Sequence, residues 1–104
     1  MTNPRLDSFR AMVAKSPDNP LAHYGLANEA LKAGLHAEAL QHYEAYLARY
    51  DDEGNAYGKV AEALERLGRV EEARAALKKG VEASYRFGHA SMAAELEERL
   101  DALG

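Results

Sequence analysis

Two consecutive 34-residue segments decide the fold: residues 20–53 read PLAHYGLANEALKAGLHAEALQHYEAYLARYDDE, and residues 54–87 read GNAYGKVAEALERLGRVEEARAALKKGVEASYRF. Five paired positions carry the same residue: Ala22 and Ala56, Ala27 and Ala61, Gly34 and Gly68, Glu38 and Glu72, Ala39 and Ala73. Both segments show the same order, which is a helical pattern, a glycine, and a second helical pattern that opens with Glu-Ala. The chain therefore contains two copies of one helical unit.

Apolar spacing and helix-end residues predict about six helices. They are expected over residues 4–15, 20–33, 36–50, 55–67, 70–87 and 89–103. Asn19 suits an N-cap with Pro20 in the first helical position, while Gly34, Gly68 and Gly88 suit helix ends that need a left-handed residue. No segment alternates apolar and polar residues over a strand-like length, so the fold class is all-α.

Composition narrows the range of functions. The chain has 104 residues, 47% hydrophobic and 29% charged, which fits a single globular domain. It lacks cysteine, a secretory signal and an apolar run long enough for a membrane span, so we expect a cytoplasmic protein without membrane contact. The net charge is −4 and the cations are scattered, so nucleic acid is not an expected partner.

The two segments resemble the tetratricopeptide repeat (TPR), whose pattern is W-x2-L-G-x2-Y, then A-x3-F, then P. The first copy has His23-x2-Leu26-Ala27-x2-Ala30 and Ala39-x3-Tyr43, and the second has Tyr57-x2-Val60-Ala61-x2-Leu64 and Ala73-x3-Leu77. His23 departs from the usual Trp, Ala27 and Ala61 replace the usual Gly, and Asp51 and Tyr85 stand where Pro is usual.

The resemblance implies an antiparallel helix-hairpin solenoid with a right-handed superhelical course. We expect a half-repeat helix over 4–19, repeat 1 over 20–53, repeat 2 over 54–87, and a capping helix over 88–104. Stacked neighbours bury the apolar faces in such a fold, so both end helices act as caps. In the last helix, Met92 and Leu96 are expected to face inward and Glu95 to face outward.

The residue types that often act in catalysis or metal binding form no known active-site or metal-site motif in this sequence. The tightest histidine cluster is His36-x-Glu38-x3-His42, but the two imidazoles are six residues apart and fall on different helix faces. We expect His23 and His36 to occupy half-buried aromatic-type positions and His42 to lie in solvent. No nucleophile elbow or phosphate-binding loop is present. We therefore expect no catalytic residue, no metal site and no cofactor.

A candidate partner surface follows from the resemblance, because TPR proteins bind peptide segments along the first helix of each repeat. The stripe opposite the expected core comprises Leu21, Tyr24, Asn28, Leu31 and Lys32 in the first copy and Asn55, Lys59, Glu62 and Arg66 in the second. Gly25 and Gly58 share this stripe, and each costs a helix about 1 kcal/mol relative to alanine. A bare groove floor would explain them, as would Tyr24 covering the space at Gly58 or neutral drift.

The expected function is a non-catalytic protein–protein interaction module that binds a partner peptide in a concave groove. The mixture of lysine, arginine and apolar side chains on the stripe suits an amphipathic peptide with one or two acidic groups. The alternative is a self-associating scaffold, in which apolar residues of the first or last helix dock a second copy. The expected state is accordingly a monomer or a weak homodimer.

Overall fold

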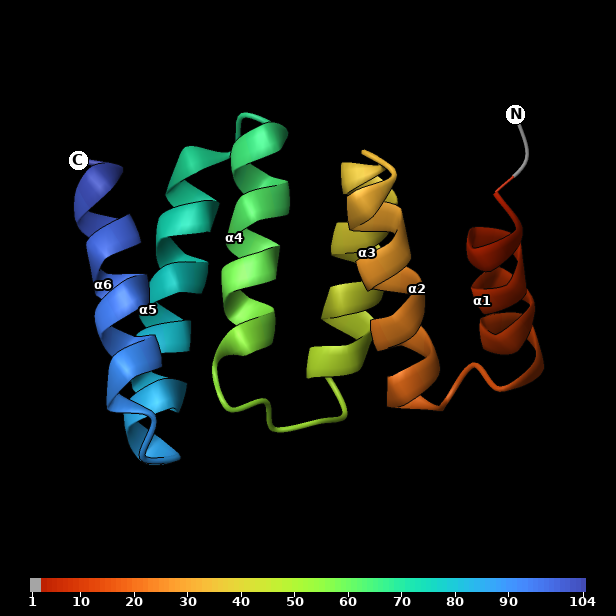
Figure 1. Ribbon diagram of the computed structural model, residues 1–104, viewed down its shortest axis with the longest axis horizontal. Coiled ribbons are helices and arrows are strands. Elements are labelled where there is room, and N and C mark those ends of the chain that lie inside the picture. Colours follow the sequence, from red (N-terminus) through yellow and green to blue (C-terminus); the bar gives the residue numbers. More distant parts are fainter. Residues whose placement is uncertain (1–2) are drawn as a thin grey trace. The chain divides into compact units, whose positions relative to one another are not determined.

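The computed structural model describes residues 3–104, and the regular structure in this range is entirely helical (Figure 1). The six helices are α1 (Pro4–Lys15), α2 (Pro20–Lys32), α3 (His36–Leu47), α4 (Asn55–Arg66), α5 (Val70–Arg86) and α6 (Ala90–Ala102). They form two compact units, one ending at Tyr50 and the other comprising Asp51–Gly104. Within each unit, successive helices pack as hairpins. The prediction of an all-α hairpin fold is confirmed.

Three tight turns of one type connect helices within the units. The N–H groups of the residues after the glycines donate to carbonyls five residues back: Leu35 to Ala30, Arg69 to Leu64, and His89 to Ser84. Gly34, Gly68 and Gly88 have φ between +76° and +79°, the left-handed conformation that glycine adopts at little cost. The prediction that helices end at these glycines is therefore correct. One such turn precedes α5 and another follows it.

The helix bounds agree with the sequence prediction to within about one residue, except at the end of α3. This helix was expected to reach Tyr50 but ends at Leu47. The N–H of Arg49 donates to the carbonyl of Tyr46 only three residues back, which closes the last turn. Tyr50 then leaves the helix and stacks its ring on Tyr46, with the centroids 5.1 Å apart. The apolar spacing predicted a longer helix because Tyr50 falls at the next apolar position of the helical pattern, although it lies beyond the end of α3.

Side-chain hydrogen bonds cap the starts of α2 and α4. Asn19 accepts a hydrogen bond from the N–H of Leu21 at 3.0 Å, with Pro20 in the first helical position, as predicted. At the start of α4, the buried carboxylate of Asp52 accepts from the N–H groups of Gly54 at 2.9 Å and Ala56 at 2.8 Å. Asp52 is therefore a specific cap of α4.

Small residues let the helices of each hairpin approach closely. In the first unit, Ala27, Ala39 and Tyr43 are all fully buried. In the second unit, Ala61, Ala73 and Leu77 are fully buried in the same way. The observed burial agrees with the repeat pattern, in which these positions must be small.

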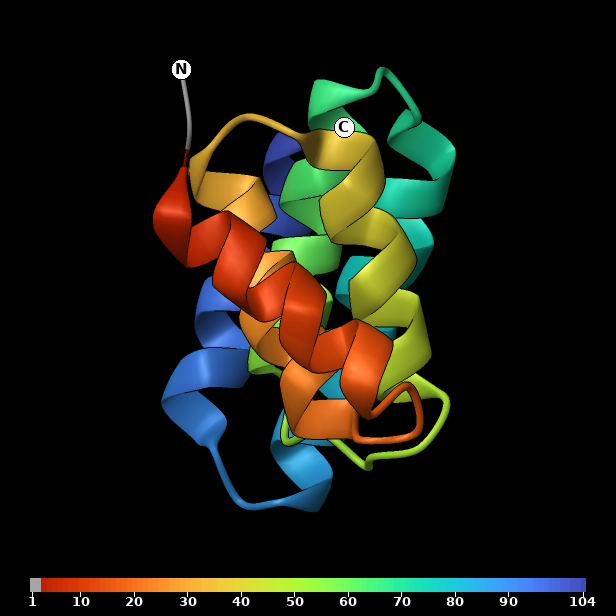
Figure 2. The same ribbon diagram turned by 90° about the vertical axis from the view of Figure 1, so that its right-hand side faces the viewer.

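The first helix lies across α2, as the view onto α1 in Figure 2 shows. Only Leu6 of its predicted apolar stripe is buried, whereas Phe9 and Val13 are half-buried and Met12 is 47% exposed. Met12 therefore does not belong to the core, because α1 has a helix on one side only. The ring of Phe9 occupies the space where a Gly25 side chain would be, so the idea of Gly25 as a bare groove floor is wrong.

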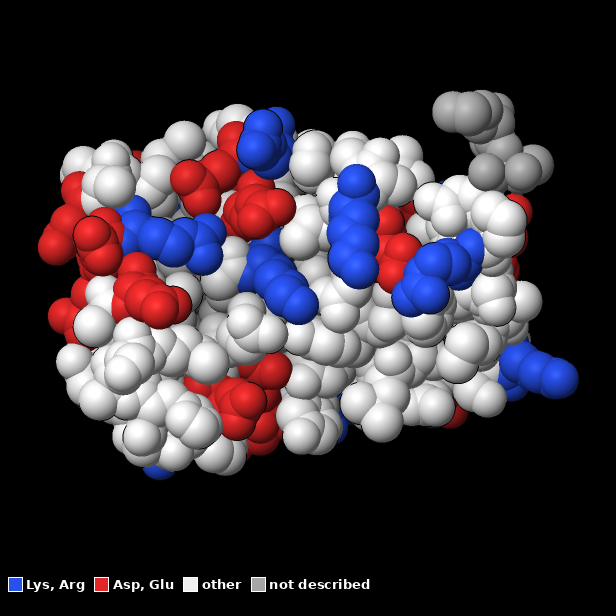
Figure 3. Space-filling model, viewed as in Figure 1, with Lys and Arg blue, Asp and Glu red and all other residues white. Residues whose placement is uncertain are grey.

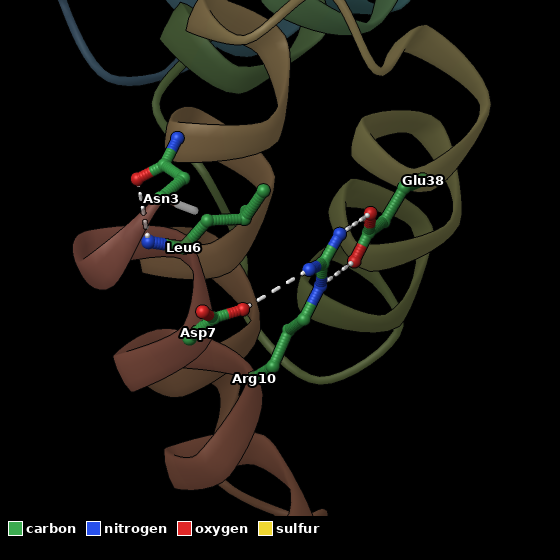
Figure 4. A network of polar contacts seen from close by, with 5 residues as sticks. All are labelled: Asn3, Leu6, Asp7, Arg10 and Glu38. Carbon is green, nitrogen blue, oxygen red and sulfur yellow. Dashed lines mark hydrogen bonds and ion pairs between the residues drawn. The ribbon is translucent and has the colours of Figure 1, made fainter. Parts of the chain in front are cut away.

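Ion pairs also hold α1 in the first unit (Figure 4). The guanidinium of Arg10 forms two hydrogen bonds, of 2.9 and 2.7 Å, with the carboxylate of Glu38 in α3. Asp7 lies 3.4 Å from the same guanidinium, and Asn3 caps α1 by accepting from the N–H of Leu6. The hydrogen bond from Arg10 lowers the pKa of Glu38. The Arg10–Glu38 pair therefore joins α1 to α3, in addition to its packing on α2.

Candidate functional site

The second unit contains a pocket of about 340 Å³ between α4 and α6. Four residues of α4 (Asn55, Gly58, Lys59 and Glu62) and four of α6 (Met92, Glu95, Leu96 and Arg99) line it. Both sets follow the spacing i, i+3, i+4, i+7, which places four side chains on one face of a helix. The pocket is therefore the space between two facing helix surfaces.

Leu96 forms the floor of the pocket and fixes the position of α6. It is 5% exposed and lies between two glycines, one in α4 and one in α5. A methyl group at Gly58 would lie 3.2 Å from Cδ2 of Leu96, and one at Gly80 would lie 2.9 Å from Cδ1. Both glycines thus provide room for Leu96. The expectation that Gly58 leaves a bare groove floor for a ligand is wrong, because the chain itself fills that space.

Arg99 forms a wall of the pocket and joins its two helices. Nη2 of Arg99 donates to the carbonyl oxygen of Gly58 at 3.1 Å and lies 3.5 Å from Oε2 of Glu65. Lys59 also interacts with another part of the chain. In contrast, Glu62 and Glu95 are exposed, and neither has a hydrogen bond or ion pair with any residue in the range 3–104.

Figure 3 shows basic and acidic side chains interspersed over the face that presents α4 and α6. Neither sign of charge dominates there, so the face is not a uniform electrostatic patch. The specificity of the pocket must therefore come from individual charged groups beside its apolar floor.

Only part of the predicted groove lines the pocket. Asn55, Lys59 and Glu62 do so, whereas Arg66 is exposed in the last turn of α4 and is not among the lining residues. The four α6 residues were missed because the last helix was interpreted as a cap with Glu95 on its outer face. Glu95 is exposed as expected, and it also borders the pocket. The spacing Met92, Glu95, Leu96, Arg99 matches that of the α4 residues and was the available signal.

The predicted α2 residues lie in the first unit, where two of them make internal contacts. The ring of Tyr24 packs at 4.5 Å from that of Tyr46 and at 6.0 Å from that of Tyr43. Asn28 accepts a 2.5 Å hydrogen bond from the hydroxyl of Tyr43. The other three α2 residues differ in exposure: Leu21 is 66% exposed, Leu31 is half-buried, and Lys32 is exposed at 3.7 Å from Glu29.

His23 and His42 form a hydrogen-bonded pair in the first unit. Nε2 of His23 lies 2.7 Å from the carbonyl oxygen of Pro17, which can only accept, so this nitrogen carries the proton. Nδ1 of His23 then accepts from Nδ1 of His42 at 2.9 Å, and the two rings stack. The expectation that His42 lies in solvent is wrong. Burial, and secondarily the neighbouring His23, lowers the pKa of His42.

Neither metal chemistry nor membrane insertion gains support from the described residues. In the range 3–104, no three His, Cys, Asp or Glu side chains are grouped so that they could hold a metal ion. None of the helices in that range is long and apolar enough to cross a membrane.

Antiparallel hairpins joined by identical glycine turns, with a pocket between two facing helices, define a helical-repeat protein. The tetratricopeptide repeat family matches residues 6–53 and 24–88 of the chain. These matches cover most of the chain, so it belongs to the tetratricopeptide repeat family. Comparison with curated proteins gave no match.

Proposed function

We propose that the chain is a non-catalytic protein-binding module and that the pocket between α4 and α6 holds a short peptide segment of a partner. Tetratricopeptide repeats are generally protein–protein interaction modules. The observation that carries the proposal is the pair of matched helix faces around the apolar floor formed by Leu96, with polar side chains around it. Such a combination of an apolar base and a few polar groups suits a ligand site.

The dimensions of the pocket limit the length of the segment. Its α4 wall extends from Asn55 to Glu62, which is about 10 Å at the helical rise of ~1.5 Å per residue. An extended peptide advances about 3.3 Å per residue, so the wall accommodates about three residues. The volume of about 340 Å³ is at the low end for ligand sites. The pocket therefore recognises one anchoring side chain and its immediate neighbours.

The remaining predicted contacts stay part of the proposal. In the first unit, exposed Leu21 offers an apolar contact, and half-buried Leu31 and exposed Lys32 lie on the same helix. Tyr24 and Asn28 would contact a ligand only through the parts of their side chains that do not already contact Tyr43 or Tyr46. The division into a half-repeat, two repeats and a cap is likewise proposed on the basis of the repeat pattern.

Peptide selection with matched variants tests the proposed site. Heptapeptides selected from a random display library on the unmodified chain are measured against Glu95→Trp, which places a large ring in the pocket. Glu98→Trp is the control, because Glu98 is exposed on the same helix and does not line the pocket. We expect Glu95→Trp to abolish binding and Glu98→Trp to retain it. Equal binding by both variants would exclude the pocket.

The alternative function, self-association, has its own supporting observation. A groove of about 390 Å³ lies along α5 and α6, lined by Lys78, Val81, Glu82, Tyr85, Glu97 and Leu100. Its lining carries one cation, Lys78, and two carboxylates, Glu82 and Glu97, so it contains both signs of charge, as a self-complementary interface requires.

Light scattering after size exclusion separates this alternative from peptide binding. Self-association predicts a dimer that Val81→Asp converts into a monomer. A monomer at all concentrations up to about 100 μM would exclude a dimer whose Kd lies well below that value.

A further inference from the structure

We infer that the peptide segment held by the α4–α6 pocket carries lysine or arginine beside an apolar anchor. This inference rests on the proposed function and specifies the partner. It reverses the expectation from the sequence, which was a ligand with acidic groups. Three observations on the second unit support it.

The first observation is the apolar base of the pocket. Leu96 is buried at the floor, and Met92 is half-buried on the same helix face, four residues earlier. The half-buried side chain of Met92 provides most of the apolar surface that a leucine or methionine of the ligand would cover, above the buried Leu96. Methionine adapts to ligands of different shape, so the pocket tolerates more than one apolar anchor.

The second observation is that both cations of the pocket already have partners. Nη2 of Arg99 donates to the carbonyl oxygen of Gly58 at 3.1 Å and lies near Glu65. Lys59 has an interaction of its own within the chain. An acidic ligand would have to compete with these contacts, and withdrawing Arg99 would break its hydrogen bond to α4.

The third observation is that both carboxylates of the pocket are available. Glu62 projects from α4 and Glu95 from α6, both are exposed, and neither has a polar partner among residues 3–104. They belong to opposite walls of the pocket, so a basic residue of the ligand can approach either of them. Charge complementarity beside an apolar base therefore favours a basic residue next to the anchor.

Two of the three basic residues that suggested an acidic ligand do not contribute to this pocket. Arg66 is not among its lining residues, and Lys32 belongs to the first unit, where it lies 3.7 Å from Glu29. Only Lys59 remains of the predicted cations, and it is engaged. The charged side chains of the pocket without a polar partner among residues 3–104 are thus its two carboxylates.

Charge-matched peptides test the inference. Three fluorescein-labelled heptapeptides share a central leucine and differ only in its two neighbours, which are both lysine, both glutamine or both glutamate. Fluorescence anisotropy gives their dissociation constants at about 50 mM and 500 mM salt. We expect the lysine peptide to bind at least tenfold tighter than the glutamate peptide at low salt, with the glutamine peptide between them. The difference should shrink at high salt.

A variant pair assigns the preference to the pocket. Glu62→Lys/Glu95→Lys should reverse the order of the lysine and glutamate peptides. Glu44→Lys/Glu98→Lys changes the net charge equally at exposed positions that do not line the pocket, and it should preserve the order. A reversed order in both variants would show that net charge, and not the pocket, sets the preference, which overturns the inference.

Tighter binding of the glutamate peptide, or no binding of the lysine peptide, would also overturn the inference. The proposed function is judged separately by the selected peptides and Glu95→Trp. Selected peptides without basic residues that still require the pocket would leave the proposed function standing and would remove only the basic ligand.

Discussion

Nη2 of Arg99 in α6 donates a hydrogen bond to the carbonyl oxygen of Gly58 in α4, at 3.1 Å. The absence of a side chain at Gly58 leaves room for this contact, since a methyl group there would lie 3.0 Å from Nη1 of Arg99. The same absence admits Leu96 to the floor of the pocket. One glycine therefore sets both the approach of α6 and the shape of the candidate site.

Removing the Arg99 guanidinium should destabilise the second unit. Arg99→Gln loses the hydrogen bond to Gly58, which is part-buried, and we expect a loss of about 1 kcal/mol in the free energy of unfolding. Urea denaturation followed by circular dichroism measures it. Arg86→Gln is the control, because Arg86 forms an exposed ion pair with Asp51 and such pairs contribute little. An equal loss in both variants would contradict the structural role of Arg99.

Two glycines with positive φ should respond very differently to alanine. Gly54 has φ +130°, and a methyl group there would overlap Oγ of the buried Ser84, so Gly54→Ala combines backbone strain with a steric clash. We expect a loss of about 3 kcal/mol or more. Gly68 has φ +76° with open space around it, so Gly68→Ala should lose only about 1 kcal/mol. Similar thermal-unfolding midpoints for the two variants would contradict this account.

The carboxylate of Asp52 should contribute as a helix cap. Asp52→Ala removes the acceptor for the N–H groups of Gly54 and Ala56, and we expect a loss of about 1–2 kcal/mol. One oxygen, Oδ2, accepts both bonds, so the amide oxygen of Asp52→Asn can replace it and should retain more than half of the stability. Urea denaturation compares the two variants. Equal losses would show that charge, and not the accepting oxygen, matters.

Acidification should destabilise the first unit through His42. Burial, and secondarily His23, lowers its pKa in the folded state, while Glu38 acts in the opposite direction. The unfolded chain then binds more protons than the folded chain below the ordinary histidine pKa of about 6.5. Stability should be complete above that value and should fall as the pH drops towards the lowered pKa.

The variant His42→Asn checks this assignment, because an amide can replace the Nδ1–H donor without titrating. Unfolding free energies between pH 7.5 and 5 should decline in the unmodified chain and stay nearly level in His42→Asn. Below about pH 4.5, Glu38 and Glu29 add a second decline, since hydrogen bonds from Arg10 and Arg5 lower their pKa values. Parallel curves above pH 5 would exclude His42 as the source.

The helices were predictable because local residues specify them. Asn19 and Pro20 begin α2, and Gly34, Gly68 and Gly88 require a backbone conformation that ends a helix. The end of α3 was not predictable, because Tyr50 continues the apolar spacing after the helix has ended.

The sequence predicted the α4 side of the candidate site but not its α6 side. Helical spacing identified the α4 face, since Asn55, Lys59 and Glu62 lie opposite the core residues of that helix. It could not identify which face of α6 meets α4, because Glu95 looks equally suited to solvent. Nor could the sequence show whether a ligand or Leu96 fills the space beside Gly58. The hydrogen bond from Arg99 to Gly58, on which the inferred preference for a basic ligand depends, arises from the packing of α6 against α4.

Amide chemical-shift mapping tests the central claim most directly. A display-selected peptide is titrated into the ¹⁵N-labelled chain, with Glu95→Trp measured in parallel. The account predicts saturable shifts centred on residues 55–62 of α4 and 92–99 of α6, which disappear in Glu95→Trp. Shifts confined to the α5–α6 groove around Val81 and Tyr85, or shifts unchanged by Glu95→Trp, would contradict it.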